Sequence, residues 1–332
     1  MDKRRAEEIF APAAREALTH FPIRPAEITF AHVSENVTFR VTEQGSGRPF
    51  VLRLHRPSYH SIDALNSEHV WTDALASAGI RVPPPVAAQS GERYVEAGVE
   101  ALGEKRWASL SGWIAGDLLA QVMANESDTA AGAHFTALGS LLARVHQQAS
   151  GWSPPPAFSR HRLDAEGLMG DAPFWGPFWQ YRHLTATESC LLLETRDVIR
   201  GALQRYGTSP HIFSMIHADA HPGNIVAGED GLALIDFDDA AFGWHQFDLA
   251  VALIWYQQRP DFAQLRDACI AGYRAVRPLS DDDLALLPMF LLARGMAQLG
   301  WFQQRPELAE PPEVRTLKGW VCEAAAEFRP PC

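Results

Sequence analysis

The chain has 332 residues, more than one hydrophobic core usually serves, so its length predicts two lobes or domains. Hydrophobic residues make up 47% of the chain and charged residues 21%, proportions that exclude a largely disordered protein. Lys and Arg together number 29 against 40 Asp and Glu, and the resulting net charge of −11 argues against nucleic acid or an anionic membrane as a partner.

Cysteine usage and the N-terminal segment bear on the cellular compartment. Cys190, Cys269, Cys322 and Cys332 are scattered and form no Cys-x-x-Cys pair, which argues against a zinc site or a disulfide framework. The first residues lack the apolar core of a signal peptide, and no uninterrupted apolar run is long enough to span a bilayer. We therefore expect a cytoplasmic protein with no membrane segment.

The first 111 residues predict a mostly β lobe. A charged, amphipathic leading helix reaches to about residue 18, and residues 28–57 then indicate three short strands. A helix from about Ser61 to Ala78 is expected to end at Gly79. Residues 82–97 and 105–117 each predict one further strand.

From Gly116 onward the pattern is mainly helical, so we expect an α+β fold. Residues 134–149 carry apolar side chains on one helical face, and residues 151–181 indicate an irregular insertion rich in Pro, Trp and Phe. A helix follows through Leu203, and residues 211–239 then predict two small strands. A helix from Ser280 to Gln298 follows later, with Ser280 as a plausible N-cap.

The segment Met215–Ala240 carries the most informative chemistry. Residues 225–226 and 232–235 are short apolar strands, and the turn at residues 228–231 joins them into a hairpin. Asp219 and Asn224 lie in the loop that enters the hairpin, and Asp236 lies in the loop that leaves it. Hairpin geometry then brings Asn224 beside Asp236, where two oxygen ligands would suit Mg²⁺. Asp219 is left to accept a proton from an attacking hydroxyl.

This pattern resembles a known group of enzymes. An Asp-x-x-x-x-Asn loop, a hairpin and Asp-Phe-Asp resemble the catalytic and metal-binding loops of protein kinases. The run His-Ala-Asp-Ala-His-Pro-Gly-Asn at residues 217–224, followed by Ile-Asp-Phe-Asp-Asp at 235–239, is similar to the aminoglycoside phosphotransferase and choline kinase superfamily. Within it, the chain most resembles bacterial homoserine kinase type II-like and stress-response kinase-like proteins, from about Phe30 to Gly300.

The resemblance implies a two-lobed, protein-kinase-like fold that uses ATP and Mg²⁺. Residues 1–111 would form a small antiparallel β lobe that binds nucleotide, and residues 112–332 a helical catalytic and substrate lobe. Asp219 would be the catalytic base, and Asn224 and Asp236 the magnesium ligands. The side chains expected to shape the site are His217, His221, Asp238 and Asp248, the last of which would brace the backbone of the catalytic loop.

The resemblance also implies nucleotide contacts in the first lobe. Ser34 and Asn36 lie in the expected nucleotide-covering loop, which here has no glycine. Arg53 would grip the α and β phosphates, where kinases use Lys, and Glu68 on the following helix would hold it in place. The strand that ends near Ser111 and Trp113 would be the hinge that pairs with adenine.

Structural readings remain open for several of these residues. Asp219, Asn224 and Asp236 are also residue types that favour turns, and His217 to His221 could bind a transition metal. Arg53 and Glu68 could be exposed charges, and His146 is expected to be a packed, hydrogen-bonded histidine. The aromatic residues of the insertion fit either the core or a substrate pocket; they are Trp175, Phe178 and Trp179. Arg294, in an apolar helix, needs a buried acidic partner that the sequence does not identify.

The sequence leaves three functions open. The first is a small-molecule kinase that phosphorylates a hydroxyl of an amino alcohol or homoserine-like compound. The second is a stress-response type Ser/Thr protein kinase, and the third a nucleotide-binding pseudokinase. Only residues 239–246 separate Asp238 from the helix expected near Phe247, whereas protein kinases use a longer segment there as a peptide platform. We therefore expect a small acceptor, with a cationic group over an aromatic ring as one option.

Overall fold

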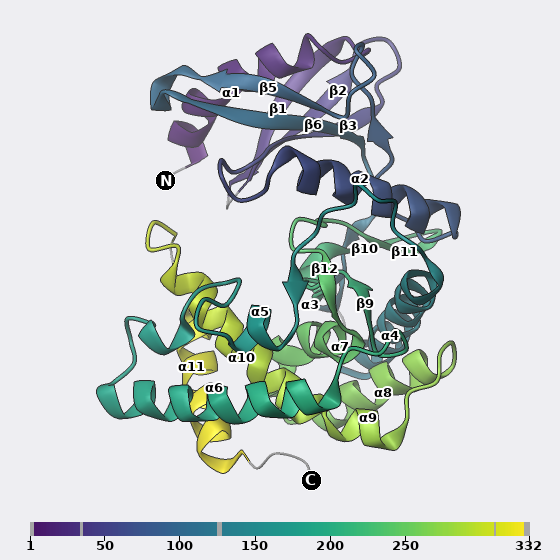
Figure 1. Ribbon diagram of the computed structural model, residues 1–332. Coiled ribbons are helices and arrows are strands. Elements are labelled where there is room, and N and C mark those ends of the chain that lie inside the picture. Colours follow the sequence, from purple (N-terminus) through teal and green to yellow (C-terminus); the bar gives the residue numbers. More distant parts are fainter. Residues whose placement is uncertain (1–2, 34–35, 125–127, 309, 329–332) are drawn as a thin grey trace. The chain divides into compact units, whose positions relative to one another are not determined.

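The computed structural model describes residues 3–33, 36–124, 128–308 and 310–328 (Figure 1). The chain folds into two compact units, one of Met1–Ala115 with Pro154–Ser159, the other of Gly116–Ser153 with Arg160–Cys332. Antiparallel sheets occur in both units and most of the helices in the second, so the predicted α+β fold class is confirmed.

In the described residues, the first unit is built on a six-stranded antiparallel sheet in the order β1-β2-β3-β6-β4, with β5 also paired to β6. Its elements in chain order are α1 (Lys3–Leu18), β1 (Pro25–Val33), β2 (Val37–Glu43), β3 (Pro49–Leu54), α2 (Ile62–Ser77), β4 (Pro85–Val86), β5 (Tyr94–Val99), the 3₁₀ helix η1 (Glu100–Leu102) and β6 (Glu104–Gly112).

One face of this sheet packs against α1, which lies beside β5 in Figure 1. Along β2 the side chains alternate, with Val37, Phe39 and Val41 buried and Arg40 exposed, as a strand with one covered face requires. The prediction of one strand over residues 82–97 is wrong, because a turn with Gly91 at φ +90° separates β4 from β5.

The second unit is mainly helical, with two small three-stranded sheets, β11-β10-β7 and β8-β12-β9, in the described residues. Its helices are α3 (Leu119–Ala124), α4 (Asp128–Gly151), α5 (Ala165–Met169), α6 (Ala186–Tyr206), α7 (His245–Leu253), α8 (Phe262–Arg274), α9 (Asp281–Ala285), α10 (Leu287–Gln303), α11 (Pro312–Glu327) and the 3₁₀ helices η2 (Phe178–Gln180), η3 (Pro222–Asn224) and η4 (Ile254–Tyr256). Its strands are β7 (Asp117–Leu118), β8 (Arg162–Leu163), β9 (Phe213–Ile216), β10 (Ile225–Gly228), β11 (Gly231–Leu234) and β12 (Ala241–Trp244).

Helices α4 and α8 approach each other closely because glycines face each other's backbone. A Cβ atom on Gly139 would lie 1.9 Å from the carbonyl oxygen of Cys269, and one on Gly272 would lie 1.9 Å from that of Thr136. Ser140 Oγ also donates to the Gly272 carbonyl at 2.9 Å. This contact holds α4 at the depth at which its residue His146 reaches the site described below.

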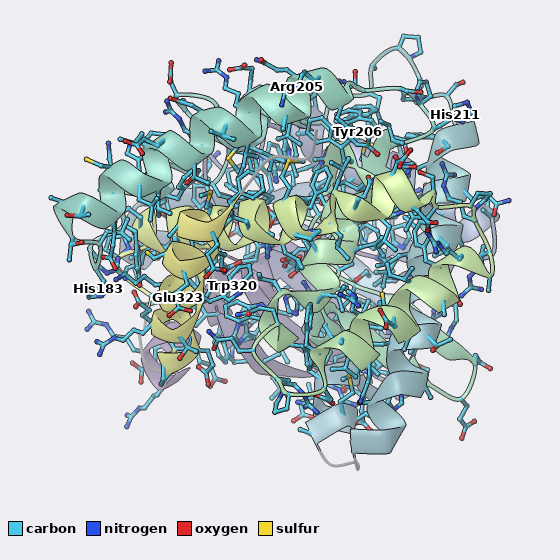
Figure 2. All side chains as sticks on the ribbon, turned by 90° about the horizontal axis from the view of Figure 1, so that it is seen from below. His183, Arg205, Tyr206, His211, Trp320 and Glu323 are labelled. Atoms are coloured by element: carbon cyan, nitrogen blue, oxygen red, sulfur yellow. The ribbon has the colours of Figure 1, made fainter. Side chains whose placement is uncertain are left out.

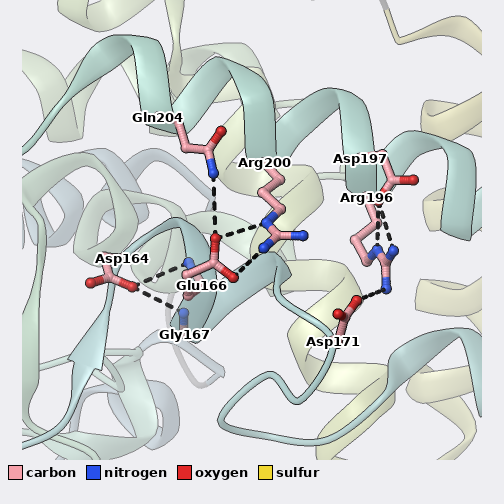
Figure 3. A network of polar contacts seen from close by, with 8 residues as sticks. All are labelled: Asp164, Glu166, Gly167, Asp171, Arg196, Asp197, Arg200 and Gln204. Carbon is pink, nitrogen blue, oxygen red and sulfur yellow. Dashed lines mark hydrogen bonds and ion pairs between the residues drawn. The ribbon is translucent and has the colours of Figure 1, made fainter.

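Polar contacts fix α6 to the elements around it. At its C-terminal end Tyr206, labelled in Figure 2, donates to Asp283 on α9 and accepts from Gln246 on α7. Along its length Arg200 pairs with Glu166 of α5, as Figure 3 shows. Asp164 accepts from the N–H groups of Glu166 and Gly167 and so caps α5.

The helical stretch Asp281–Gln303 is the one described segment long and apolar enough to cross a membrane on length and composition alone. In the structure 72% of its apolar window is buried inside the protein, as expected of a core helix. Ser280 caps its start by accepting from Asp283 N–H, which confirms the predicted N-cap. The cytoplasmic location stays a prediction.

Residues 211–244 contain two strands that the sequence did not predict. Besides the expected hairpin of β10 and β11, β9 and β12 pair with each other from Ile216↔Ala241 to Phe213↔Trp244. Both are four-residue, mostly apolar runs, too short to be told from helix by their periodicity. β12 therefore fills half of the expected 239–246 connection, and α7 begins at His245.

Candidate active site

Two loops of the second unit run between the same two small sheets. Residues 217–224 connect β9 to β10, and residues 235–240 connect β11 to β12. Because β9 pairs with β12 and β10 with β11, the two loops start and end at neighbouring strands. The Ile235 N–H donates to the Asn224 carbonyl at 3.0 Å, and His217 Nε2 lies 3.1 Å from the Ile235 carbonyl. The loops are thus joined at both the backbone and a side chain.

Asp219 is the most heavily contacted side chain of the first loop. Its Oδ1 accepts from Arg294 Nη2 at 2.7 Å, and its Oδ2 accepts from Asn224 Nδ2 at 2.8 Å. His221 Nε2 lies 3.6 Å from the same Oδ2, and its Nδ1 accepts from the Gly223 N–H at 3.0 Å. These contacts fix the carboxylate in orientation, while a carboxylate has about four lone-pair positions and so keeps acceptor capacity.

The electrostatic environment keeps Asp219 ionised. Burial by itself raises the pKa of Asp219, but the charge and hydrogen bond of His221, and then the charge of Arg294, outweigh burial and set the pKa at about 2. An aspartate with such a pKa is a weak base that carries its charge throughout the physiological pH range. It is better suited to aligning a hydroxyl than to removing its proton early.

His217 is fully buried, and both of its ring nitrogens have backbone partners. Nε2 donates to the Ile235 carbonyl, and Nδ1 accepts from the Asp219 N–H at 3.3 Å. Burial lowers the pKa of His217 against the opposing charges of Asp248 and Asp219, so the ring is neutral. These contacts leave no ring nitrogen of His217 for a transition metal, and the described residues hold no cluster of three or more His, Cys, Asp or Glu arranged for one.

The second loop begins in an unusual backbone conformation. Asp236 has φ +64°, and Ala218 in the first loop has φ +65°, both in the left-handed region that non-glycine residues seldom adopt. Strain of this kind is retained mainly at functional sites. Asp238 is 7% exposed, and its carbonyl accepts from the buried Arg160, as do those of Phe237 and Ala240.

Asp248 on α7 holds the backbone of the first loop. Its Oδ2 accepts from the His217 N–H at 2.9 Å, and its Oδ1 accepts from the Ala218 N–H at 2.7 Å. His146 Nε2 donates to the same Oδ2 at 3.0 Å, and His146 Nδ1 accepts from Tyr273 Oη at 2.9 Å. Burial raises the pKa of Asp248 to about 6, although His217 and the two backbone N–H groups oppose it. Asp248 thus contacts two consecutive N–H groups of the first loop, and its bracing role stays a prediction.

The predicted nucleotide contacts of the first unit lie on three neighbouring segments of it. Ser34 is outside the described residues, and Asn36 is 8% exposed with its Oδ1 accepting from the Arg56 N–H at 2.9 Å. Arg53 lies on β3 opposite Thr38 and Ser109. Its positive charge is one of the causes that lower the pKa of His69 on α2. Glu68, the neighbour of His69 on α2, is 8% exposed.

The expected hinge lies at the C-terminal end of β6. Ser111 is opposite both Val51 and Pro85, and Trp113 follows directly after the strand. The Trp113 ring is 39% exposed, with the Arg40 guanidinium 4.9 Å from its centre. Neither contact tests the predicted pairing with adenine, which stays a prediction.

Trp175 and Phe178 of the 151–181 insertion belong to the core, whereas Trp179 is only partly buried. Trp175 is 2% exposed and Phe178 fully buried, and the Trp175 ring stacks on Phe247 at 5.8 Å. The Arg294 guanidinium lies 5.4 Å from the centre of the Trp175 ring, and Arg196 lies 4.8 Å from that of Trp179. The core reading therefore holds for Trp175 and Phe178, and the cation over Trp175 is a side chain of the protein itself.

Sequence reasoning missed the roles of two buried arginines at the site. The apolar sequence around Arg294 predicts a buried acidic partner but does not identify it. The partner is Asp219, which lies 75 residues away in the chain. Arg160 contacts carbonyl groups 77 to 80 residues away, and carbonyl acceptors leave no sequence signal. The position of Arg160 within the aromatic-rich 151–181 insertion was the only local hint.

Comparison with known proteins supports the same reading of the chain. A sequence model of the phosphotransferase enzyme family matches residues 28–279. Amicoumacin kinase of Bacillus subtilis (strain 168) is 23% identical over 303 residues, covering 88% of this chain and 84% of that protein. Homoserine kinase of Rhizobium rhizogenes is 30% identical over 232 residues, covering 67% of this chain and 63% of that protein.

Among solved structures, a microcompartment-associated aminopropanol kinase is 28% identical, with a TM-score of 0.81 and 94% of each chain covered. The chain spans 61% to 84% of the lengths of the first relatives it matches by sequence. These similarities confirm the predicted resemblance and the protein-kinase-like fold.

Proposed function

Because the chain belongs to the phosphotransferase enzyme family, we propose that it transfers the γ-phosphoryl group of ATP to a hydroxyl of a small amino alcohol, in a reaction that requires Mg²⁺. The observation that carries the proposal is the Asp219 carboxylate, held by Arg294 and Asn224 beside the loop that bears Asp236. Such an arrangement suits phosphoryl transfer, which depends on positioning and charge neutralisation.

The choice of acceptor rests on relatives and on one feature of the fold. The aminopropanol kinase and the homoserine kinase are both named for small amines that carry a hydroxyl group. In this chain β12 begins at Ala241, three residues after Asp238, where a protein kinase would need a longer platform for a peptide. Both points favour a small acceptor over a protein side chain.

The residues near Asp219 fit a hard divalent cation. Asn224 Nδ2 donates one hydrogen bond to the carbonyl of Asp219 and one to its Oδ2. The amide oxygen of Asn224 therefore points away from Asp219. Asp236 adds a carboxylate from the adjoining loop, and amide and carboxylate oxygens are the ligands that Mg²⁺ prefers. We assign Asn224 and Asp236 as its ligands; when bound, Mg²⁺ would neutralise the phosphate charge of ATP.

In the mechanism that follows, Asp219 accepts a hydrogen bond from the acceptor hydroxyl and aims its oxygen at the γ-phosphorus. With a pKa of about 2, Asp219 takes the proton only late, when the P–O bond to the acceptor is forming. This order agrees with a loose transition state, in which the attacking oxygen needs little prior deprotonation. His217 and Asp248 keep the loop backbone in the required conformation.

The first unit would supply the nucleotide contacts. We assign residues 1–111 to nucleotide binding and residues 112–332 to catalysis and acceptor binding. Arg53 would bind the α and β phosphates with its bidentate fork, and Glu68 would orient it. The backbone near Ser111 and Trp113 would contact adenine.

A screen of ATP consumption tests the proposal. The enzyme is incubated with Mg²⁺, ATP and single candidates: 1-amino-2-propanol, homoserine, ethanolamine, choline, a sugar or a generic protein. We expect turnover with an amino alcohol and the phosphorylated product in the mass spectrum. Transfer to protein Ser or Thr with none to the small molecules would reject the acceptor class, and no ATP binding at all would reject the kinase activity.

A further inference from the structure

Arg160 is a buried arginine that contacts the backbone of the second loop. It is 8% exposed and donates from Nε to the Ala240 carbonyl at 2.6 Å. Its Nη2 donates to the Phe237 carbonyl at 3.1 Å and also to the Asp238 carbonyl. One guanidinium group therefore binds three carbonyl oxygens within four consecutive residues.

The geometry uses a property that is specific to arginine. Nε and Nη2 lie along one edge of the planar guanidinium group, and their N–H directions are fixed relative to each other. The three carbonyl groups must then keep one mutual arrangement to satisfy this edge. A lysine ammonium has the charge but no such edge, so it cannot impose the same arrangement.

These carbonyl groups follow directly after Asp236. The Ala240 N–H donates back to the Phe237 carbonyl at 3.0 Å, so residues 237–240 form a closed turn around the guanidinium. Asp236 at the start of this turn has φ +64°, a conformation that costs roughly 1–3 kcal/mol and persists only where the surroundings enforce it. Arg160, which binds three of the four carbonyl groups that follow Asp236, is placed to enforce it.

We propose that Arg160 is a positioning residue that holds the Asp236–Asp238 segment in its metal-binding conformation. The inference rests on the proposed function, because it takes Asp236 to be a ligand of the divalent cation. Partners that orient a metal ligand from behind typically change metal affinity by about 10-fold to 100-fold when they are removed. The same change is expected here, although Arg160 contacts the backbone and not the carboxylate.

Two variants and one control test the inference. Arg160→Met keeps the apolar stem and removes the donors, and Arg160→Lys keeps the charge and removes the fork. The matched control is Arg162→Met, two residues along the chain, where an exposed guanidinium pairs with Asp164. Titration calorimetry measures binding of Mn²⁺ to each protein saturated with a non-hydrolysable ATP analogue, and binding of the analogue without metal.

We expect the half-saturating Mn²⁺ concentration to rise about 10-fold or more in Arg160→Met and less in Arg160→Lys. Metal-free affinity for the analogue should stay within about twofold of wild type, Arg162→Met should match wild type, and excess Mg²⁺ should restore much of any lost rate. Folded variants with unchanged metal affinity would overturn the inference, and so would failure of both variants to fold. If wild type itself binds neither analogue nor metal, it is the proposed function that fails.

Discussion

Arg294 Nη2 lies 2.7 Å from Oδ1 of Asp219, and the Arg294 side chain is 6% exposed. This ion pair joins the core helix α10 to the loop of residues 217–224, about 75 residues earlier in the chain. The same guanidinium lies over the Trp175 ring, 5.4 Å from its centre, in a cation–π contact. Asp219 is therefore oriented from a part of the structure that the local motif does not include.

Arg294→Met should lower kcat about 10-fold to 100-fold, the rate equivalent of one charge-assisted hydrogen bond that orients the carboxylate. Arg294→Lys should recover part of the loss, because it restores the charge without the fixed plane. Steady-state kinetics with the identified acceptor measures both. Arg266→Met, at an exposed arginine of α8, is the control, and a normal kcat in Arg294→Met would remove Arg294 from the mechanism.

The same variant should change the pH profile. Without Arg294 the pKa of Asp219 should rise from about 2 toward its ordinary value of 3.8. Since the ionised form is the active one, the acid limb of kcat should move to higher pH in the variant. An acid limb unchanged between wild type and Arg294→Met would contradict the assigned electrostatic role.

Asp219→Asn should reduce kcat by about 100-fold to 10,000-fold, the usual contribution of a group that takes a proton in the transition state. Asn keeps the size of the side chain and an oxygen that faces Arg294, so ATP affinity should change little. Single-turnover kinetics and nucleotide titration separate the two effects. Asp267→Asn, at an exposed position of α8, serves as the control; near-normal turnover in Asp219→Asn would exclude the assignment.

Asp236→Ala should abolish the metal dependence of nucleotide binding, since it removes one of two assigned oxygen ligands and the only charged one. Calorimetric titration of ATP with and without Mg²⁺ measures this dependence. Asp230→Ala, in the exposed turn of the same hairpin, should behave as wild type. Identical titrations for wild type and Asp236→Ala would show that Asp236 is not a ligand.

Arg53→Ala should raise the KM for ATP about 10-fold, because it removes a charge-assisted contact with the phosphates. Arg53→Lys should lie between this variant and wild type, since Lys keeps the charge and loses the fork. Arg48→Ala, at an exposed position just before β3, is the control. Full activity and an unchanged KM in Arg53→Ala would assign the phosphate contact to another residue.

Asp248 gives the fold a specific dependence on pH. Its pKa is about 6 in the folded protein and about 3.9 in the unfolded chain, so the folded state holds this proton more tightly. The contribution of Asp248 to the free energy of unfolding is therefore fully present below about pH 4. It is lost as the pH rises through 6, and the total loss is up to about 3 kcal/mol. Denaturant unfolding should show wild type losing stability relative to Asp248→Asn between pH 4 and 7; a constant difference would contradict this.

Local patterns in the sequence were sufficient to predict the hairpin of β10 and β11. They also predicted that Asp219 and Asn224 precede the hairpin and that Asp236 follows it. Turn residues and apolar runs specify a hairpin within a few residues, and a hairpin brings its two ends together. The strands β9 and β12 could not be predicted in this way, because they pair with each other across residues 217–240 and β12 also pairs with the distant β8. The partners of Arg160, His146 and Arg294 likewise depend on the tertiary fold, and carbonyl acceptors have no residue type to reveal them.

The short segment Pro154–Ser159 belongs to the first unit, although the chain on both sides of it belongs to the second. Within it the Ser159 N–H donates to Ser67 Oγ on α2 at 2.8 Å. A fragment that ends at Ala115 would therefore lack the Pro154–Ser159 part of the first unit. The complementary fragment would contain this segment although it does not belong to the second unit. Split-protein reporters or domain exchange with a homologue need breakpoints on both sides of this segment as well as near residue 115, so that the segment stays with helix α2, to which it is hydrogen-bonded.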